Sequence, residues 1–364
     1  MTLPADDTAR AATIEAAPQR PALAGRRLAV RADGDAGIGT GHVMRCLALA
    51  GGWVTAGGSA RLACTALPGS IAERYAEAGI AVERRGTWRP AELLGAADAV
   101  VLDLPGAEPG YGDPGRRAVL LTIDDIGDRP AYPGDVLLNQ NAHATPALYQ
   151  GKTTARLCLG PAWSLLRPEF AGHDRARHVP DRLARVLVLL GGADPHGHSA
   201  RMLDAVAAAA TTLRPSPEVV LVVGAANPAL AALRRQAAGL PVRAEIQHDV
   251  RDMAALLGAA DLAVSAAGST VWEMAALGTP MILAAQNRSE LGPAEALARH
   301  GAAVDLGPFE ALDPRAVTAT VAALASDPER RRAMSAAGRR LVDGRGVDRM
   351  LALLAELMAA RQPV

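Results

Sequence analysis

The sequence predicts an α/β protein of two domains, each a parallel sheet covered by helices, which face each other across a cleft. Three observations lead to this prediction. The 364 residues exceed what one hydrophobic core usually holds. From Arg27 onward, short Val, Leu and Ala runs alternate with Ala-rich helical stretches, as expected for strands joined by crossover helices. Only 3% of the residues are aromatic, so the core is aliphatic, as in helix-covered sheets.

The first half of the chain is predicted to hold one complete sheet. We expect its strands at residues 28–33, 60–65, 81–84, 99–104, 118–124 and 136–139. Helices are expected at residues 41–57, 69–79 and 90–97. This N-terminal domain spans residues 26–160. Residues 161–184, rich in charges and prolines and without a sustained apolar period, form the predicted linker.

A second alternation predicts a C-terminal domain at residues 185–364. We expect its strands at residues 186–190, 219–223, 242–246, 262–265, 281–284 and 303–306, with helices between them. Further helices are expected at residues 314–325, 328–341 and 347–360. The last helix either stays with the second domain or packs back on the first. The chain thus looks like two Rossmann-like halves with parallel sheets.

Composition excludes several classes of function. Lys plus Arg and Asp plus Glu both number 38, so the overall field favours neither nucleic acid nor a membrane as partner. No run approaches the roughly 20 apolar residues of a membrane span. Residues 1–25 lack the basic start and apolar stretch of a signal peptide and are expected to be a disordered tail. We expect a soluble, cytoplasmic protein, and its oligomeric state is unknown from the sequence.

No metal or other cofactor is expected. Cys46, Cys64 and Cys158 are an odd number without metal-ligand spacing, and each lies in an apolar run, which favours buried reduced thiols. His196 and His198 lie close together, but no further Cys or His cluster accompanies them. The chain has no G-x-x-x-x-G-K-[ST] and no H-E-x-x-H motif, which disfavours a P-loop NTPase and a zincin.

The first candidate site is the glycine-containing loop at residues 31–42. Ligands of open α/β sheets bind beyond the carboxyl ends of strands, and glycines let a ligand come close. His42 begins the following helix, whose dipole is expected to lower its pKa and favour the neutral form of a general base. The alternative is an ordinary histidine at a helix start. Asp33 is assigned to the site, and Asp35 to capping the helix.

Other polar residues follow predicted strands of the first domain. Arg45, one turn after His42, either pairs with the carboxylates of this loop or forms a structural salt bridge. Asp124 and Asp125 end one strand, and the Asn-Gln-Asn run at residues 139–141 ends the next. These side chains either point into the cleft or stabilise turns.

The second domain has two strand-turn-helix loops suited to an anion. Gly191 and Gly192 follow a strand and precede a helix, where backbone N–H groups receive phosphate. Gly268, Ser269 and Thr270 precede a later helix, and hydroxyls and free N–H groups there can hold a diphosphate without a metal or a lysine.

Further polar residues lie near these loops. Glu273, one turn into the later helix, either accepts ribose hydroxyls or completes a capping box with the preceding hydroxyl residues. Gln286 and Asn287 are a polar pair after the strand at residues 281–284. His248 is also assigned to the nucleotide site.

Together these residues resemble the UDP-sugar hydrolases of the pseudaminic acid pathway. The opening motif that carries the resemblance consists of Arg31, Asp33, Ile38, Gly39, Gly41, His42, Arg45, Cys46, Leu47 and Leu49. Further matches are Asp124, Asp125, residues 138–141, 165–170, 191–195 and 265–273, Leu277, Gly278, Pro280 and Asn287. The resemblance covers nearly the whole chain after the tail. Ala193 and residues 288–293 depart from the family's pattern.

The family is similar to the GT-B glycosyltransferases that use UDP-N-acetylglucosamine. The resemblance therefore implies a GT-B fold and hydrolysis of UDP-2,4-diacetamido-2,4,6-trideoxy-β-L-altropyranose to the free sugar and UDP. Water would attack the anomeric carbon with inversion, and His42 matches the family's base. Substrate-binding residues are expected at Arg31, Asp33, Gly39, Gly41, Asp125, Asn141 and Asn287. UDP-binding residues are expected at Gly191, Gly192, His248, Gly268, Ser269, Thr270 and Glu273.

Other functions share this nucleotide site. A GT-B glycosyltransferase using a UDP-N-acetylhexosamine would pass the sugar to an acceptor, and a hydrolase of a related UDP-diacetamido sugar would differ in the sugar alone. A non-catalytic UDP-sugar-binding protein would have no use for His42 as a base. Release of UDP in water alone separates hydrolysis from transfer and from binding.

Overall fold

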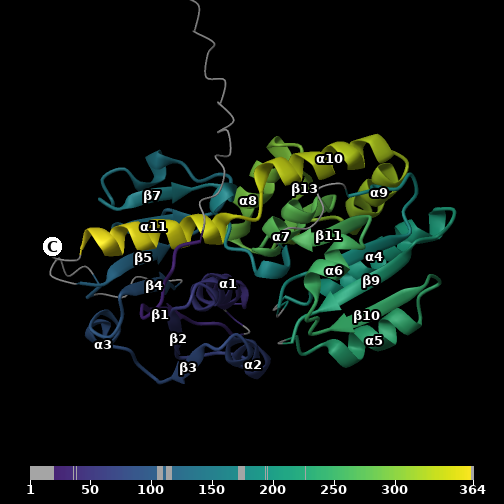
Figure 1. Cartoon of the computed structure of the whole chain (residues 1–364). Helices are drawn as coiled ribbons and strands as arrows, with labels where there is room; N and C mark the ends of the chain where they lie inside the picture. Colours follow the sequence, from purple (N-terminus) through teal and green to yellow (C-terminus); the bar gives the residue numbers. More distant parts are fainter. Residues whose placement is uncertain are drawn as a thin grey trace, which may run out of the picture.

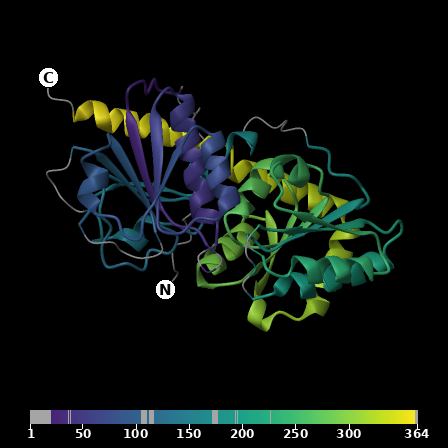
Figure 2. The ribbon, with the colours of Figure 1, turned by 90° about the horizontal axis from the view of Figure 1, so that it is seen from below.

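The computed structural model describes residues 20–361, except residues 36, 38, 105–109, 112–116, 171–176, 193, 195 and 226. Most of the predicted tail, part of the predicted linker, and Ala193 therefore lie outside the described residues. The described chain forms two α/β lobes side by side (Figures 1 and 2). Each lobe is built on one parallel sheet, as predicted.

The first lobe contains a seven-stranded sheet in the order β3-β2-β1-β4-β5-β6-β7. Its strands are β1 (Arg27–Ala32), β2 (Ser59–Cys64), β3 (Ala81–Arg84), β4 (Ala99–Asp103), β5 (Val119–Ile123), β6 (Val136–Asn139) and β7 (Arg156–Leu159). Its helices are α1 (Gly41–Thr55), α2 (Gly69–Glu77) and α3 (Pro90–Leu94), followed by the 3₁₀ turns η1 (Pro146–Tyr149), η2 (Pro161–Trp163) and η3 (Pro168–Phe170). All six predicted strands are present. Strand β7 escaped prediction because it is a four-residue edge strand with one buried side chain, Cys158.

The second lobe contains a six-stranded sheet in the order β10-β9-β8-β11-β12-β13. Its strands are β8 (Arg185–Leu189), β9 (Glu218–Val223), β10 (Ala244–His248), β11 (Leu262–Ala266), β12 (Met281–Ala285) and β13 (Ala303–Pro308). Its helices are α4 (His198–Thr212), α5 (Leu230–Ala238), α6 (Met253–Gly258), α7 (Thr270–Leu277), α8 (Arg288–Arg299), α9 (Pro314–Ala325) and α10 (Pro328–Leu341), with the turn η4 (Phe309–Ala311). Strand β10 begins at Ala244, two residues later than predicted, after a bend at residues 241–242.

The apolar runs of the central strands are buried on both faces, as sheets covered on both sides require. Every residue of β4 and β5 is buried, and so is every residue of β11 and β12. Helix α1 packs on β1 and β2 because its apolar side chains recur at helical spacing, as Val43, Cys46, Leu49, Ala50 and Trp53 do. This packing fixes the first turn of α1 at the carboxyl edge of the first sheet.

The chain crosses between the lobes twice, through residues 160–184 and again between α10 and α11 (Gly346–Ala360). Helix α11 runs back along the first sheet (Figure 1, yellow) and contributes Met350, Leu351 and Leu354 to the first core. The last helix therefore packs back on the first domain, which was one of the two arrangements that the sequence left open. The crossovers touch, since a Cβ atom on Gly346 would lie 2.2 Å from the carbonyl oxygen of Ser164.

The first core begins earlier than the sequence indicated. We expected the tail to reach residue 25, but Leu23 is 1% exposed and belongs to the first core. Its N–H also donates to the carbonyl oxygen of Ala56 at 2.8 Å. An isolated leucine between proline and glycine carries no periodic pattern, so the sequence did not mark this contact.

The order of the strands decides which loops meet across the interface. Helix α2, after β2, contacts Asp249, which follows β10. The start of α1, after β1, lies against the loops after β8 and β11, where a Cβ atom on Gly192 would be 2.5 Å from Thr40 Oγ1. At the other end, His143, after β6, lies against Gly292 in α8, which follows β12. The interface therefore runs in one line from β2 and β10 to β6 and β12.

Candidate active site

A cleft of about 420 Å³ lies between the two lobes, within the usual size of a small-molecule site. Residues that line it from the first lobe include Gly39, Thr40, Gly41, His42, Arg45, Asp125, Gln140 and Asn141. Residues that line it from the second include Gly191, Gly192, Gly268, Ser269, Thr270, Glu273, Gln286 and Asn287. The fold thus brings most of the predicted site residues together.

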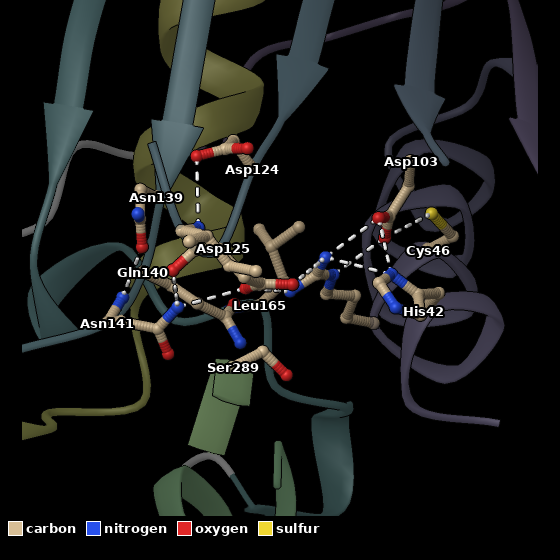
Figure 3. Close-up of polar contacts among 12 residues, drawn as sticks. His42, Cys46, Asp103, Asp124, Asp125, Asn139, Gln140, Asn141, Leu165 and Ser289 are labelled. Atoms are coloured by element: carbon tan, nitrogen blue, oxygen red, sulfur yellow. Dashed lines mark hydrogen bonds and ion pairs between the residues drawn. The ribbon is translucent and has the colours of Figure 1, made fainter. Parts of the chain in front are cut away.

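His42 lies in the first turn of α1 and faces Asp103 at the end of β4 (Figure 3). Its Nδ1 is 2.7 Å from Oδ1 of Asp103, a carboxylate that is 1% exposed. Burial alone would raise the pKa of Asp103, but the charges of Arg45 and His42 hold it well below its ordinary value. The ionised carboxylate accepts the Nδ1 proton, which leaves Nε2 of a neutral His42 free to accept a proton in the cleft.

Arg45 joins Asp103 to Asp125. Its Nε and Nη2 donate to the two oxygens of Asp103 at 2.6 and 2.7 Å, and Nη1 and Nη2 donate to those of Asp125 at 2.8 and 2.9 Å. These paired bonds hold both carboxylates in place. From the sequence, we considered the carboxylates of the first loop as possible partners of Arg45. Its carboxylate partners come instead from the ends of β4 and β5.

The pKa of His42 is shifted in the direction opposite to our prediction. Burial lowers it, but the nearby charge of Asp103 and the hydrogen bond to it outweigh burial, and the net pKa lies above 6.5. We predicted a lowered value from the helix dipole alone. That prediction was wrong because a carboxylate in contact with the imidazole acts more strongly than the partial charge of a helix end. A raised pKa makes His42 a stronger base once it is neutral.

The polar runs after β5 and β6 divide into two groups. Asp125 and Asn141 line the cleft and are joined, since Asn141 Nδ2 donates to Asp125 Oδ1 at 2.9 Å (Figure 3). Asp124 and Asn139 face inward, where both bond the hydroxyl of Tyr149 at 2.8 and 2.7 Å. The sequence left open whether these side chains point into the cleft or stabilise turns. Asp125 and Asn141 point into the cleft, whereas Asp124 and Asn139 stabilise the local structure.

The start of α1 meets the start of α7 directly. A Cβ atom on Gly41 would lie 2.8 Å from Ser269 Oγ, so the helix that carries His42 touches the loop predicted to bind diphosphate. Helix α7 begins at Thr270, and its first turn has no side-chain cap among the described residues. The capping box considered for Glu273 is therefore not formed.

The glycine loop before α4 contains an aspartate, Asp194, whose carboxylate already occupies the start of that helix. The carboxylate of Asp194 accepts the N–H groups of His198 and Ser199 at 2.9 and 2.8 Å. This carboxylate accepts N–H groups of the first turn of α4, which we had predicted from the sequence to bind phosphate. The start of α7 is thus the better place for a ligand's diphosphate, with Gly192 opposite to it in the cleft lining.

Glu273 is held by an arginine from the linker. Its Oε1 accepts a hydrogen bond from Nη2 of Arg167 at 3.2 Å, and Arg167 also pairs with Glu169 at 2.6 Å. Burial raises the pKa of Glu273, while Arg167 opposes that rise. The glutamate also lines the cleft.

Three predicted site residues do not line the cleft. Arg31 and Asp33 are buried and pair with each other at 2.8 Å. Asp33 Oδ1 also accepts the N–H groups of Thr65 and Ala66, so it ties the end of β1 to the end of β2. His248 is the exposed last residue of β10, and the residue after it, Asp249, lines the cleft instead.

Sequence reasoning missed several residues of the site. Asp103 was not named as a candidate, although it lies one residue before the end of the predicted strand at residues 99–104, and that position is the one signal that could have identified it. Arg167 lies in the matched run at residues 165–170, but nothing in its neighbours indicated a partner 106 positions away. Glu290 lines the cleft from α8, where burial raises its pKa and its Oε2 accepts the N–H of Gln286 at 2.8 Å.

Cys46, Cys64 and Cys158 are free and buried, as predicted. Nowhere in the described ranges do three His, Cys, Asp or Glu side chains group so as to hold a metal ion. His198 stacks on the ring of Phe309 at 4.5 Å. In the part of the chain that the structure covers, no helix has the length and apolarity to cross a membrane.

Comparison with known sequences relates the second lobe to glycosyltransferases. Residues 186–345 match the glycosyltransferase family 28 C-terminal domain. The spore coat polysaccharide biosynthesis protein SpsG of Bacillus subtilis is 30% identical over 57% of this chain and 60% of its own length. The UDP-N-acetylglucosamine–N-acetylmuramyl-(pentapeptide) pyrophosphoryl-undecaprenol N-acetylglucosamine transferase of Pseudomonas fluorescens is 37% identical over 44% of this chain. The chain spans 60% and 45% of the lengths of these two relatives.

Solved structures share the whole arrangement at low sequence identity. Acinetobacter baumannii MurG is similar with a TM-score of 0.61 and 17% identity, over 91% of this chain and 99% of that one. The glycosyltransferase VinC, solved with dTDP, also has a TM-score of 0.61, with 15% identity over 92% and 100% of the two chains. The chain therefore has the GT-B fold of two Rossmann-like domains, and residues 186–345 of its second lobe are similar to the glycosyltransferase family 28 C-terminal domain.

Proposed function

We propose that this chain cleaves a UDP-sugar between the anomeric carbon and the diphosphate, with His42 as the base that activates an oxygen nucleophile. The observation that carries the proposal is the His42–Asp103 pair at the cleft, 2.7 Å apart, on the helix that touches Ser269. A base is thus held beside the loop best suited to the leaving diphosphate. The family 28 match over residues 186–345 supports a nucleotide sugar as the ligand.

The two ends of the cleft differ in a way that supports one orientation of this substrate. We place the diphosphate in the middle of the cleft, against Gly192, Ser269 and Thr270 of its lining. The end beyond β6 and β12 is polar and suits the sugar, with Asp125, Gln140, Asn141, Asn287, Ser289 and Glu290 in its lining. Glu273 is placed to accept ribose hydroxyls. The nucleoside then extends toward β10.

The residues present supply each part of the proposed step. Neutral His42 takes the proton of the nucleophile on Nε2, and ionised Asp103 stabilises the imidazolium that results. The nucleophile attacks the anomeric carbon from the face opposite the diphosphate, which inverts that centre. The bond to the diphosphate breaks, and backbone donors at Gly192 and the start of α7 stabilise the charge on the departing UDP.

We propose water as the nucleophile and UDP-2,4-diacetamido-2,4,6-trideoxy-β-L-altropyranose as the substrate, in pseudaminic acid biosynthesis. The support is the opening motif from Arg31 to Leu49, which resembles the hydrolases of that pathway. Within it, His42 and Arg45 both belong to the site, whereas Arg31 and Asp33 stabilise the fold around it.

A second candidate is glycosyl transfer, which the comparisons favour. The matched family model is a glycosyltransferase domain, and the Pseudomonas fluorescens relative is named as a transferase. In that reaction His42 would take the proton from an acceptor hydroxyl, and every other contact would stay the same. The two candidates differ in the nucleophile alone.

The test measures UDP released from the altrose-configured UDP-sugar by the wild-type protein and by His42→Ala. Hydrolysis predicts steady release in water, a loss of about 10²-fold to 10⁴-fold in the variant, and UDP affinity within twofold of wild type. Release that requires an added acceptor supports transfer instead. Equal rates in both proteins would remove His42 from the mechanism.

A further inference from the structure

The buried carboxylate of Asp103 has a hydrogen-bond donor that the proposed mechanism does not use. Its Oδ1 accepts hydrogen bonds from His42 Nδ1 and Arg45 Nη2, both at 2.7 Å. Its Oδ2 accepts from Arg45 Nε at 2.6 Å and from the thiol of Cys46, whose Sγ lies at 3.5 Å (Figure 3). Residues 42, 45 and 46 are three and four positions apart on α1, so they project from the same face of the helix. One helix face therefore holds both oxygens of Asp103.

We propose that Cys46 is a positioning residue for the base: its thiol holds Oδ2 of Asp103, which keeps Oδ1 facing the imidazole of His42. Cys46 is fully buried and does not line the cleft, so it acts through Asp103 and does not touch a ligand. Without the thiol, Oδ2 would be held by Arg45 alone, and Arg45 also bonds Asp125. This inference rests on the proposed function, because it requires His42 to act as a base.

The thiol is in the protonated form that this role requires. Burial raises the pKa of Cys46 well above its ordinary value, and the negative charge of Asp103 raises it further. Cys46 therefore keeps its proton and remains a donor to the carboxylate. A thiol is a weaker donor than a hydroxyl, so it fixes Oδ2 while leaving most of the negative charge of Asp103 to act on His42.

The other titratable groups near Asp103 do not replace this contact. Asp125, which follows β5, is joined to Asp103 through Arg45, which bonds both carboxylates. Tyr75 of α2 is also close, but its hydroxyl donates to a backbone carbonyl oxygen of α1 at 2.6 Å. Burial, together with Cys46 and Asp103, raises the pKa of Tyr75 well above its ordinary value, so this side chain stays neutral. Substitution of Cys46 therefore changes a donor to Oδ2 without changing a charge.

The experiment measures the pH dependence of kcat and kcat/KM for UDP release from the altrose-configured UDP-sugar by wild type, Cys46→Ala, Cys46→Ser and Cys158→Ala. Cys46→Ala removes the donor, whereas Cys46→Ser replaces it with a stronger donor of similar size. Cys158→Ala is the matched control, because Cys158 is a buried thiol of the same core on β7, which β5 and β6 separate from β4. Thermal unfolding establishes that each variant is folded.

We expect Cys46→Ala to lower kcat about three- to tenfold, as the loss of one hydrogen bond implies. The acid limb of kcat/KM should move to higher pH by about 0.4–1 unit, because a carboxylate with one donor fewer attracts the imidazolium proton more strongly. Cys46→Ser should keep kcat within about threefold of wild type and move the acid limb to lower pH, since a stronger donor takes more of that charge. Cys158→Ala should behave as wild type, and UDP affinity should stay within about twofold in all three variants.

Each outcome separates this inference from the function on which it rests. A role in packing alone would move the acid limb in neither Cys46 variant, so an unshifted acid limb in both overturns the inference. Cys46→Ala/Asp103→Asn that is more than about threefold slower than Asp103→Asn alone also overturns it, because Cys46 would then act without Asp103. If Cys46→Ala does not fold, the direction of the shift in Cys46→Ser decides.

The rate of His42→Ala shows which claim has failed. Wild-type behaviour of both Cys46 variants, beside an inactive His42→Ala, removes Cys46 from the mechanism and leaves the proposed function standing. Equal rates of wild type and His42→Ala contradict both the proposed function and the role of Cys46.

Discussion

At the scale of single residues, the proposed chemistry depends on one buried carboxylate. Asp103 orients His42, raises its pKa and is itself kept ionised by Arg45. The sequence identified His42 through its place in the motif, but it did not identify Asp103, which is 61 positions away. Contacts between strand ends depend on the sheet order, and no local pattern contains that order.

Asp103→Asn should lower turnover by about 10²-fold or more and shift the acid limb of the pH profile to lower pH. His42 acts as a base when neutral, so activity is lost as pH falls through its pKa. Asp103 holds that pKa above 6.5, and removing its charge lowers it. The pH dependence of kcat/KM measures the shift.

The double variant His42→Ala/Asp103→Asn checks that Asp103 acts through His42. The double variant should be no slower than His42→Ala alone, because a positioning residue has no effect once its partner is gone. A further tenfold loss in the double variant, with its fold intact by circular dichroism, would assign Asp103 a separate role.

At the scale of elements, the site depends on turns that approach closely enough to exclude side chains. A Cβ atom on Gly224, after β9, would lie 2.2 Å from the carbonyl oxygen of Gly192, after β8. The turn at Gly192 is therefore positioned by contact with its neighbour. The sequence predicted the glycines after β8, since glycine before a helix is a known pattern, whereas Gly224 carried no such mark.

Gly224→Ala should lower the free energy of unfolding of the second domain by about 1–3 kcal/mol, because backbone must move to admit the methyl group. UDP affinity should fall with it as the turn at Gly192 shifts. Gly258→Ala is the control in the same lobe, since a Cβ atom there meets nothing within 4 Å. Thermal unfolding and calorimetry measure both effects, and equal behaviour of the two variants would contradict the assignment.

The sequence predicted the elements better than their contacts. Alternating apolar runs located the strands of both sheets, and helices α9 and α10 begin and end where periodicity places them. The edge strand β7 and the late start of β10 escaped, because short edge strands with exposed side chains lack a continuous apolar run. Arg31 and Asp33 were assigned to the substrate but do not line the cleft, and the sequence could not separate the two roles because a charged pair beside a glycine loop looks the same whether it binds a ligand or joins two strand ends.

At the scale of the whole molecule, the two domains are joined by a helix as well as by the cleft that both of them line. Helix α11 belongs to the first core although it follows the whole second domain in sequence. Its apolar spacing predicted a helix but not the lobe on which it packs, since both cores are aliphatic and accept the same side chains.

Leu354→Ala should destabilise the first domain by about 2–5 kcal/mol, because the side chain is fully buried in the first core. The second domain should still bind UDP, because its own loops remain intact. The affinity should be lower than in the wild type, because the first domain also lines the cleft. Glu356→Ala, whose side chain is 65% exposed on the same helix, should change stability by less than about 0.5 kcal/mol. Loss of stability confined to the second domain would contradict the packing of α11.

The most direct test of the proposed chemistry is the fate of oxygen from heavy-oxygen water. The altrose-configured UDP-sugar is incubated with the wild-type protein in labelled water, and the products are analysed at once by mass spectrometry. Attack by water at the anomeric carbon, activated by His42, predicts the label in the free sugar and none in UDP. Label in a phosphate product, with the sugar unlabelled, would contradict attack at carbon and the role of the His42–Asp103 pair.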